Sequence, residues 1–323
     1  MEAQRGVTTG TALFSEDISI GGQAVIEGVM MRTPRSIATA VRKPDKEILI
    51  KNDPYVALSN RYNALNTPIL RGFISFFEML FIGIRALNFS ADVAIEEQEK
   101  VEKGKNWERS QAKKITTGLM LIGILVLAFA VGLGFFFALP LFLTEITGLS
   151  RNALSFNIVA GFIRVGFFLA YLWGISQWKE IRRFFEYHGA EHKSVNAFES
   201  GEELKVENLH KYSTHHPRCG TSFLLIVVIL AIFLFAVADT VVEIMIGHRP
   251  SVLQRLATHF SLLPLLAGIS YELLKLSGKK RDSRLMRLLA APGIWLQRIT
   301  TGEPDDAQLE VAIAALKSAL EET

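Results

Sequence analysis

The stretch ITTGLMLIGILVLAFAVGLGFFFALPLFL, residues 115–143, carries no charged side chain. It exceeds the ~20 residues that an α-helix needs to cross a bilayer. Three further apolar runs, each with a few polar residues, span 157–177, 222–247 and 252–276. Hydrophobic residues make up 50% of the chain, and the mean hydropathy is +0.27. The sequence therefore predicts a mainly α-helical, polytopic membrane protein with four transmembrane helices.

The distribution of basic residues predicts the orientation of these helices. Lys and Arg cluster in 32–51, 100–114, 179–193 and 279–287, whereas the other two connections are short. Cytoplasmic segments of membrane proteins are enriched in Lys and Arg. We therefore expect both termini and all four basic segments to be cytoplasmic. The single cysteine excludes an intrachain disulfide, which fits a site in a reducing compartment.

Outside the four runs, the pattern predicts a small sheet and several amphipathic helices. Short apolar stretches broken by Gly and Pro lie between Ile18 and Ile50 and indicate strands. Thr67-Pro68 is a typical helix start. The helix from there to about Ala91 carries a polar stripe, which favours an interfacial position over a membrane crossing. The stretch 287–299 indicates a second interfacial segment.

A last helix, opened by acidic residues near Glu303, has an apolar face that needs a partner, either the N-terminal unit or a second subunit. We expect a homo-oligomer in the second case. The predicted organisation is a β-rich cytoplasmic segment (1–66), an interfacial helix with a charged linker (67–114), a first transmembrane pair (115–178), a cytoplasmic His/Cys segment (179–221), a second transmembrane pair (222–278) and a cytoplasmic amphipathic region (279–323).

The His/Cys segment combines Tyr187-His-Gly-Ala-Glu-His192 with His215-His-Pro-Arg-Cys-Gly220. Five of the seven histidines and the only cysteine lie between these limits. In a helix, His188 and His192 stand one turn apart on one face. A third ligand from His215, His216 or Cys219 would complete an open catalytic zinc site, whereas four protein ligands would make a structural site. The alternative to metal binding is that His188 and His192 are exposed polar residues on a helix that leaves the membrane.

Three residues near this segment suggest catalytic or supporting roles. His188-x-x-Glu191-His192 matches the H-x-x-E-H pattern in which the glutamate acts as general base. Cys219 is either a small buried hydrophobe or, beside Arg218, a thiolate. Glu272, near the cytoplasmic end of the fourth run, is a further candidate ligand or supporting residue.

Two other groups of polar residues permit both structural and functional interpretations. Arg164 and Asp239 fall at similar depth in their predicted helices, so we expect a pair, either an interhelical clasp or part of a polar pathway. In the glycine-rich stretch 21–32, Gln23, Glu27 and Arg32 either meet a substrate or form a structural turn with a local ion pair.

Three separated motifs, Gly21-Gly-Gln-Ala-Val-Ile-Glu-Gly-Val-Met-Met-Arg32, Tyr187-His-Gly-Ala-Glu-His-Lys193 and His216-Pro-Arg-Cys-Gly-Thr-Ser-Phe223, resemble the YqhQ-like family of bacterial multi-pass membrane proteins. That family is described as predicted metal-dependent enzymes of unknown activity. The resemblance covers most of residues 21–300. It supports the membrane location and implies the ligand set His188, His192, His216 and Cys219, with His215 outside the motif. Our overall prediction is an inner-membrane protein.

The resulting hypothesis is hydrolysis or group transfer at a divalent-metal site, with zinc as the expected cofactor. Glu191 would move the proton, and Arg218 or Arg32 would stabilise negative charge on a lipid-linked, peptide or other membrane-proximal substrate. One alternative is a channel or transporter with a structural or regulatory metal site, in which Arg164 and Asp239 belong to the pathway. The other is a membrane scaffold. We expect the lipid bilayer, and no nucleic acid, as a partner.

Overall fold

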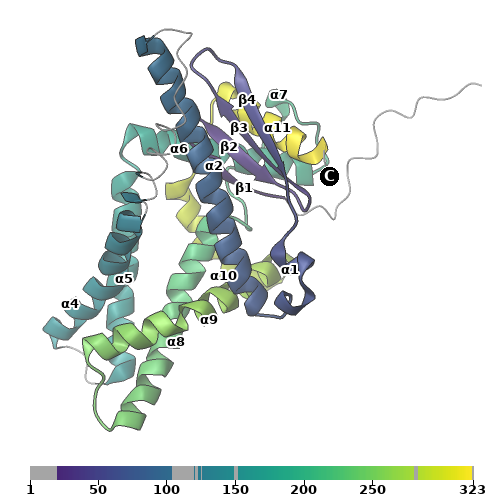
Figure 1. Ribbon diagram of the computed structural model, residues 1–323. Coiled ribbons are helices and arrows are strands. Elements are labelled where there is room, and N and C mark those ends of the chain that lie inside the picture. The colour runs from purple at the N-terminus through teal and green to yellow at the C-terminus, as the bar shows by residue number, and fades with distance from the viewer. Residues whose placement is uncertain are drawn as a thin grey trace, which may run out of the picture.

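The computed structural model describes residues 20–103, 120, 123, 124, 126–148, 152–279 and 283–321 (Figure 1). Four strands come first: β1 (Gly21–Val25), β2 (Gly28–Arg32), β3 (Ser36–Arg42) and β4 (Ile48–Pro54). The helices are α1 (Leu58–Arg61), α2 (Leu70–Lys103), α4 (Leu139–Thr147), α5 (Ala153–Ile175), α6 (Lys179–Glu199), α7 (Val206–Leu209), α8 (Gly220–Ile246), α9 (Val252–Lys279), α10 (Arg284–Thr300) and α11 (Asp306–Glu321). Two short turns, η1 (Asn63–Leu65) and the π-helical η2 (Gly134–Ala138), precede α2 and α4.

Within the described residues, four helical stretches have the length and hydropathy of membrane spans: Val126–Thr147, Leu154–Ile175, Gly220–Ile246 and Val252–Leu276. The predicted number and order of candidate spans are thereby confirmed for the described residues, and four such helices are typical of a multi-pass membrane protein. Large apolar side chains on these helices are exposed, including Phe162 at 74% and Phe233 at 66%. Such exposure suits contact with lipid tails. The first span ends at Thr147, beyond the predicted residue 143, and residues 115–119 lie outside the described part.

The predicted N-terminal strands form an antiparallel sheet in the order β1-β2-β3-β4. Successive side chains of a strand point to opposite faces, and both faces here are covered. Ala24, Val29 and Met31 belong to a core shared with α6 and α11, whereas Val25 and Met30 pack with Ala86 of α2. This double coverage explains why four of the five β2 residues are buried.

The apolar face of α11 packs on the sheet of the same chain, which is the first of its two predicted partners (Figure 1). Leu309, Val311 and Leu316 are fully buried there. Asn52 donates a hydrogen bond to the Ser318 carbonyl at 2.9 Å, which connects β4 to the end of α11. The C-terminal helix and the N-terminal strands therefore share one core, although more than 250 residues separate them.

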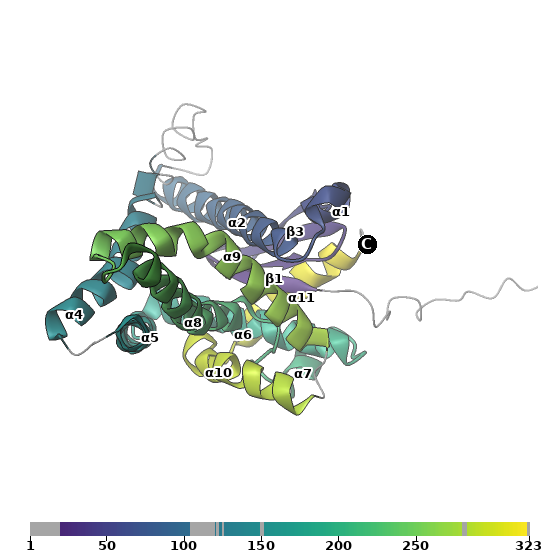
Figure 2. The same ribbon diagram turned by 90° about the horizontal axis from the view of Figure 1, so that it is seen from below.

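Helix α2 is longer than predicted and connects the sheet to the spans. It continues without a break to Lys103, so the predicted boundary near Ala91 is wrong. Its start lies beside α9 (Figure 2), where a Cβ on Gly72 would come within 2.8 Å of the Gly268 carbonyl oxygen. The Arg71 guanidinium donates two hydrogen bonds of 2.6 Å to the Glu272 carboxylate of α9. Helix α2 therefore contacts α9 at its start and packs against the sheet further along, at Ala86.

The predicted pairing of Arg164 with Asp239 is wrong. Asp239 of α8 instead accepts hydrogen bonds from Arg255 at 2.5 Å and Asn157 at 2.8 Å, and lies 3.1 Å from Nε2 of His259. Arg164 donates to the Phe136 carbonyl at 2.9 Å. Equal depth in the helices was not sufficient to predict this pair, because the rotation of each helix about its axis also decides which side chains are in contact. With three partners on one buried carboxylate, the geometry suits an interhelical clasp.

Candidate metal centre

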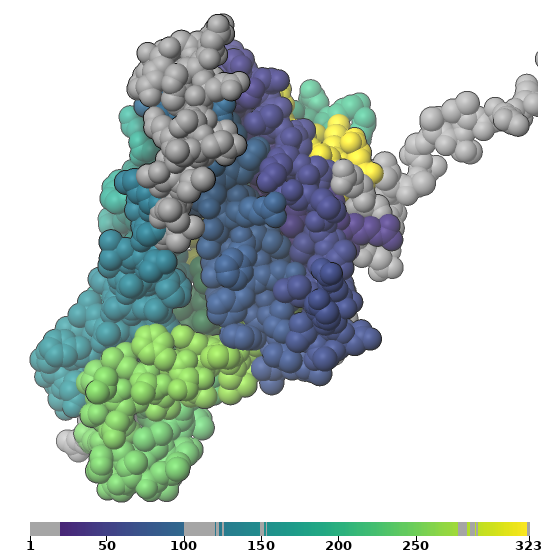
Figure 3. Space-filling model, viewed as in Figure 1, coloured from purple at the N-terminus to yellow at the C-terminus, as the bar shows by residue number. Residues whose placement is uncertain are grey.

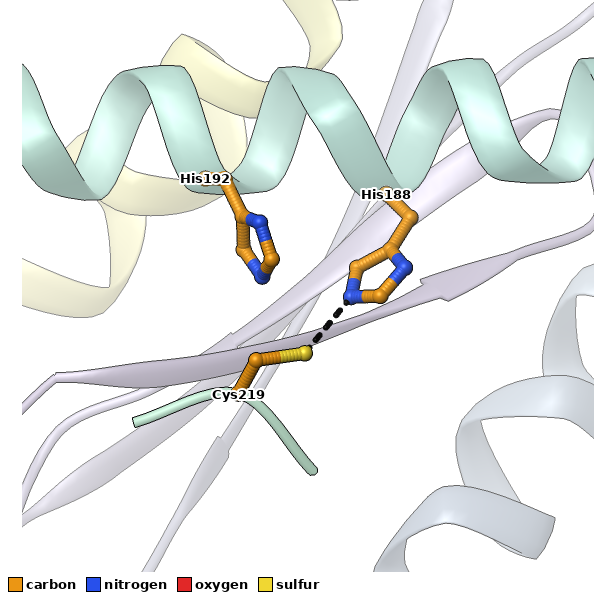
Figure 4. A group of neighbouring side chains, drawn as sticks. All are labelled: His188, His192 and Cys219. Carbon is orange, nitrogen blue, oxygen red and sulfur yellow. Dashed lines mark hydrogen bonds between the residues drawn. The ribbon is translucent and has the colours of Figure 1, made fainter. Parts of the chain in front are cut away.

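Helix α6 and the start of α8 bring three candidate ligands together (Figure 4). His188 and His192 lie one turn apart on α6, and both rings point toward Cys219 at the N-terminus of α8. One ligand atom from each residue lies within 4.8 Å of the other two. Cys219 is 6% exposed and His192 only 1%. We call these three residues the His/Cys cluster.

Backbone carbonyls fix the orientation of both imidazole rings. Nδ1 of His188 lies 2.7 Å from the Thr300 oxygen, and Nδ1 of His192 lies 2.5 Å from the Thr214 oxygen. Because a carbonyl only accepts, each Nδ1 carries a proton, and in the neutral ring each Nε2 then keeps its lone pair. Histidines that bind metals are held in this way by a partner on the other ring nitrogen. Both rings therefore have the tautomer that a metal ligand requires.

The distances within the His/Cys cluster also fit a tetrahedral zinc site. Nε2 of His188 lies 3.2 Å from the Cys219 sulfur. Bond lengths of ~2.0 Å to nitrogen and ~2.3 Å to sulfur would place these ligand atoms about 3.5 Å apart. Nε2 of His192 is buried and has no hydrogen-bond partner among the described residues. A buried nitrogen left without a partner is unfavourable unless a ligand satisfies it.

Glu191 approaches the same two nitrogen atoms. Its Oε2 lies 3.5 Å from Nε2 of His192 and 3.9 Å from Nε2 of His188. Burial raises the pKa of Glu191 to about 7, and the opposing effect of His188 is smaller. Gly22 of β1 leaves the space for this carboxylate, because a Cβ there would lie 2.6 Å from Cγ of Glu191. The carboxyl group is thus positioned either as a fourth ligand or as a proton acceptor near neutral pH.

His216 and His215 lie outside the His/Cys cluster in this arrangement. The His216 ring centroid is 5.8 Å from that of His192, but its Nδ1 accepts from the Arg218 backbone at 3.3 Å. Its Nε2 lies 3.5 Å from a Glu199 oxygen. Arg218 forms an ion pair with the same Glu199. Nδ1 of His215 lies 3.1 Å from the Ser213 hydroxyl.

Burial lowers the pKa of His216, and the nearby Glu199 carboxylate only partly opposes this effect. Burial also lowers the pKa of His215. Both histidines are therefore predominantly neutral near pH 7. The structure thus gathers two of the implied histidine ligands and the cysteine, with His216 as the adjacent residue.

The other predicted site residues separate into two groups. Gln23 and Arg32 line a cavity of about 300 Å³ together with Glu191, His192 and Cys219. Glu27 does not line it, and instead accepts two hydrogen bonds of 2.5 Å from Arg183 and one of 3.2 Å from Tyr187. Glu27 sits in the β1–β2 turn with φ 51°, which matches the structural interpretation. Glu272 is occupied by its pair with Arg71.

Part of the cavity wall is apolar, and several of its residues come from α2, α8 and α9. Its members are Ile20, Met30, Phe76, Met79, Val195, Phe223 and Leu274. Phe76 and Met79 belong to α2, Phe223 to α8 and Leu274 to α9. The polar wall carries His192 and Cys219 of the His/Cys cluster, together with Glu191 and Arg218. The site therefore has one face suited to apolar groups and one face suited to polar chemistry.

Sequence reasoning missed the residues that support the cluster from α10. Gln297 is fully buried, and its amide accepts from the His216 backbone N–H at 2.8 Å and donates to the His216 carbonyl at 2.8 Å. Thr300 supplies the carbonyl that binds His188. The one local signal was Gly189 between the candidate ligands, where a Cβ would lie 2.0 Å from the Gly302 oxygen. A glycine at that point indicates close approach of another backbone.

Comparison with known proteins links the chain to proteins without an assigned function. The family model described as "Protein of unknown function (DUF1385)" matches residues 67–322. The chain is 34% identical over 311 residues to "Uncharacterized protein YqhQ" of Bacillus subtilis (strain 168), and the match covers 93% of this chain and 92% of that relative. The resemblance inferred from the three motifs is thereby confirmed. No solved structure matches the chain.

Proposed function

The chain belongs to the DUF1385 family of proteins of unknown function, and we propose that it is a zinc-dependent hydrolase or transferase acting on a membrane-proximal substrate. One observation carries the proposal. Two buried or half-buried histidines have Nδ1 fixed by backbone carbonyls, the Nε2 of His188 lies 3.2 Å from the Cys219 sulfur, and a ligand atom of His192 lies within 4.8 Å of both. Neither a helix surface nor an apolar core requires two histidines fixed in this way, whereas histidines that bind a metal typically have their other ring nitrogen held by such a partner.

His188, His192 and Cys219 would hold the ion, and Glu191 would act beside it. When bound, zinc supplies Lewis-acid chemistry and activates water for attack on an acyl or phosphoryl group. Glu191, with its pKa near 7, can accept a proton and return it to a leaving group. Arg32 and Arg218 line the same cavity and provide positive charge for a developing anion.

The apolar wall of the cavity supports an amphipathic substrate. Phe223 and Leu274 lie on candidate membrane spans and Phe76 lies on α2, and all three line the same cavity as His192 and Cys219. A substrate with an apolar segment and a hydrolysable polar group would contact both walls. The basic segments flanking the spans favour a site on the cytoplasmic side of a bacterial inner membrane.

A structural zinc site is the second candidate, and burial favours it. His192, Glu191 and Cys219 are each less than 9% exposed, and Glu191 is near enough to serve as a fourth ligand after a small shift. A site closed by four protein ligands would stabilise the junction of α6, α8 and α10 without turnover. The two candidates predict different effects of changing Glu191.

The test uses zinc-loaded, detergent-purified full-length protein and chromogenic 4-nitrophenyl esters and phosphodiesters of increasing chain length. Glu191→Gln should keep zinc and lower turnover by about 10²–10⁴-fold, as expected for loss of a general base. Glu203→Gln, at an exposed position outside the cavity, serves as the matched control. Equal turnover by wild type and Glu191→Gln would contradict the enzymatic role. Loss of zinc from Glu191→Gln would assign the glutamate as a ligand and favour the structural site.

A further inference from the structure

A second, larger hollow lies away from the His/Cys cluster. It measures about 820 Å³ and is bounded by β3, β4, α1 and α2, on the sheet face opposite α11. In the space-filling view this face is formed by the purple strands and the blue α1 and α2 (Figure 3). We call it the α1–α2 groove. The proposed catalytic chemistry does not use its residues.

The charge of the α1–α2 groove is unbalanced. Four basic residues line it against two acidic ones. Asp53 is shared, since it lies 3.3 Å from Lys51 and 3.7 Å from Arg85. The Glu78 carboxylate accepts the backbone N–H of Leu58 at 3.0 Å. The two carboxylates are thus already engaged, and a surplus of positive charge faces the groove.

Exposed apolar side chains accompany this charge. Phe81 is 69% exposed and Val56 62%, and both line the groove. Phe77 and Leu80, on the same part of α2, are each 41% exposed. A mixture of exposed large apolar groups and basic groups is typical of a surface that lies at the boundary of a membrane.

The position of the groove relative to the spans also favours a location at the membrane boundary. Helix α2 begins beside α9, where Arg71 binds Glu272, and residue 272 lies near one end of the span Val252–Leu276. The groove residues of α2 follow within five turns of that contact, between Glu78 and Phe89. The α2 wall of the groove therefore begins, at Glu78, about two helical turns from the contact with α9.

We propose that the α1–α2 groove binds an anionic phospholipid of the surrounding membrane. Arg61 and Arg85 hold the headgroup phosphate, because guanidinium groups pair well with phosphate oxygens. An acyl chain lies along Phe81 and Val56. Basic pockets at the membrane surface recognise anionic lipids in this manner. A second copy of the chain fits less well, since a symmetric contact would place the same surplus of positive charge on both sides.

The test measures thermal stability of detergent-purified full-length protein during titration with dioleoyl phosphatidylglycerol or dioleoyl phosphatidylcholine. A ligand that binds only the folded state raises the melting temperature with its concentration. We expect a saturable rise with the anionic lipid alone. Arg61→Ala combined with Arg85→Ala should raise its apparent Kd by about tenfold or more. Arg61→Lys combined with Arg85→Lys should recover most of the binding, because the charges are kept.

Lys205→Ala combined with Lys211→Ala is the matched control. It removes the same charge from exposed sites next to α7, which packs in the core on the other face of the sheet. Equal stabilisation by both lipids would contradict recognition of charge. Equal stabilisation by soluble glycerol 3-phosphate would assign the groove to a free phosphate compound. If neither lipid acts and native mass spectrometry shows a dimer that the Arg61→Ala, Arg85→Ala variant loses, the occupant is a second copy.

Discussion

Gly189→Ala tests whether close packing of α6 on the 300–302 segment supports the candidate metal site. A Cβ at this position would lie 2.0 Å from the Gly302 oxygen, whereas carbon and carbonyl oxygen normally stay ~3.3 Å apart. One of the two backbones must therefore move by roughly 1 Å, since neither atom belongs to a flexible side chain. That movement would lengthen the 2.7 Å bond from His188 to Thr300 and the 2.7 Å bond from Gly302 to Phe185.

The expected change in stability follows from one stabilising and two destabilising effects. Replacing glycine by alanine within a helix contributes up to ~1 kcal/mol of stability. Overpacking costs about 1–3 kcal/mol, and each weakened hydrogen bond adds about 1 kcal/mol. With two hydrogen bonds weakened, we therefore expect a net loss of about 2–4 kcal/mol. Zinc affinity should fall by about 10–100-fold, because the partner that orients His188 is displaced.

The assay is thermal unfolding in detergent, together with competition for zinc against a chromogenic chelator. Gly166→Ala on α5 is the control, because a Cβ there meets nothing within 4 Å. It should leave zinc affinity unchanged and stability equal or higher. If Gly189→Ala matched this control in both measurements, the packing argument would be refuted.

Three further changes test other parts of the account. Asp239→Asn leaves the buried Arg255 without its anionic partner. We expect the free energy of unfolding to fall by about 3–5 kcal/mol, measured by thermal unfolding. Glu243→Gln on the same helix is the control, and an equally small loss in both variants would contradict this prediction. Gln297→Leu leaves the backbone N–H and carbonyl of His216 without their partner. The free energy of unfolding should fall by about 2–4 kcal/mol, and a variant as stable as the wild type would contradict this role of Gln297. In metal-free protein, the folded-state pKa of Glu191 is raised from 4.5 to about 7. The folded chain then keeps a proton that the unfolded chain releases, so stability should fall by up to about 3 kcal/mol as pH rises from about 4.5 to about 7. Glu191→Gln should abolish this pH dependence, and an unchanged profile would show that Glu191 is not its source.

The features that sequence predicted well depend on local patterns. Hydropathy locates a span because every residue of a membrane helix meets the same apolar solvent. The 3.6-residue period placed His188 and His192 on one face. Cys219 was predicted as a ligand from the motif His216–Phe223, because no local pattern in the sequence links residues 188 and 219.

The features that sequence missed depend on helix rotation and distant contacts. Arg164 and Asp239 have similar depth, but depth does not say which way a side chain points. The spacing of Arg255 and His259, one helical turn apart, was an available signal for the true partners of Asp239. Nothing local identifies Gln297 or Thr300 as supports of the cluster, because their contacts join α10 to segments 81 and 112 residues away.

The most direct test of the central claim is the metal content of detergent-purified protein, measured by mass spectrometry as zinc per chain. Wild type, purified without chelator and resupplied with zinc, should contain close to one zinc ion. His188→Ala and Cys219→Ser should each lose it, while His248→Ala, an exposed histidine beyond α8, should retain it. Wild-type protein that binds no zinc, or zinc that persists in both ligand variants, would contradict a metal site at His188, His192 and Cys219.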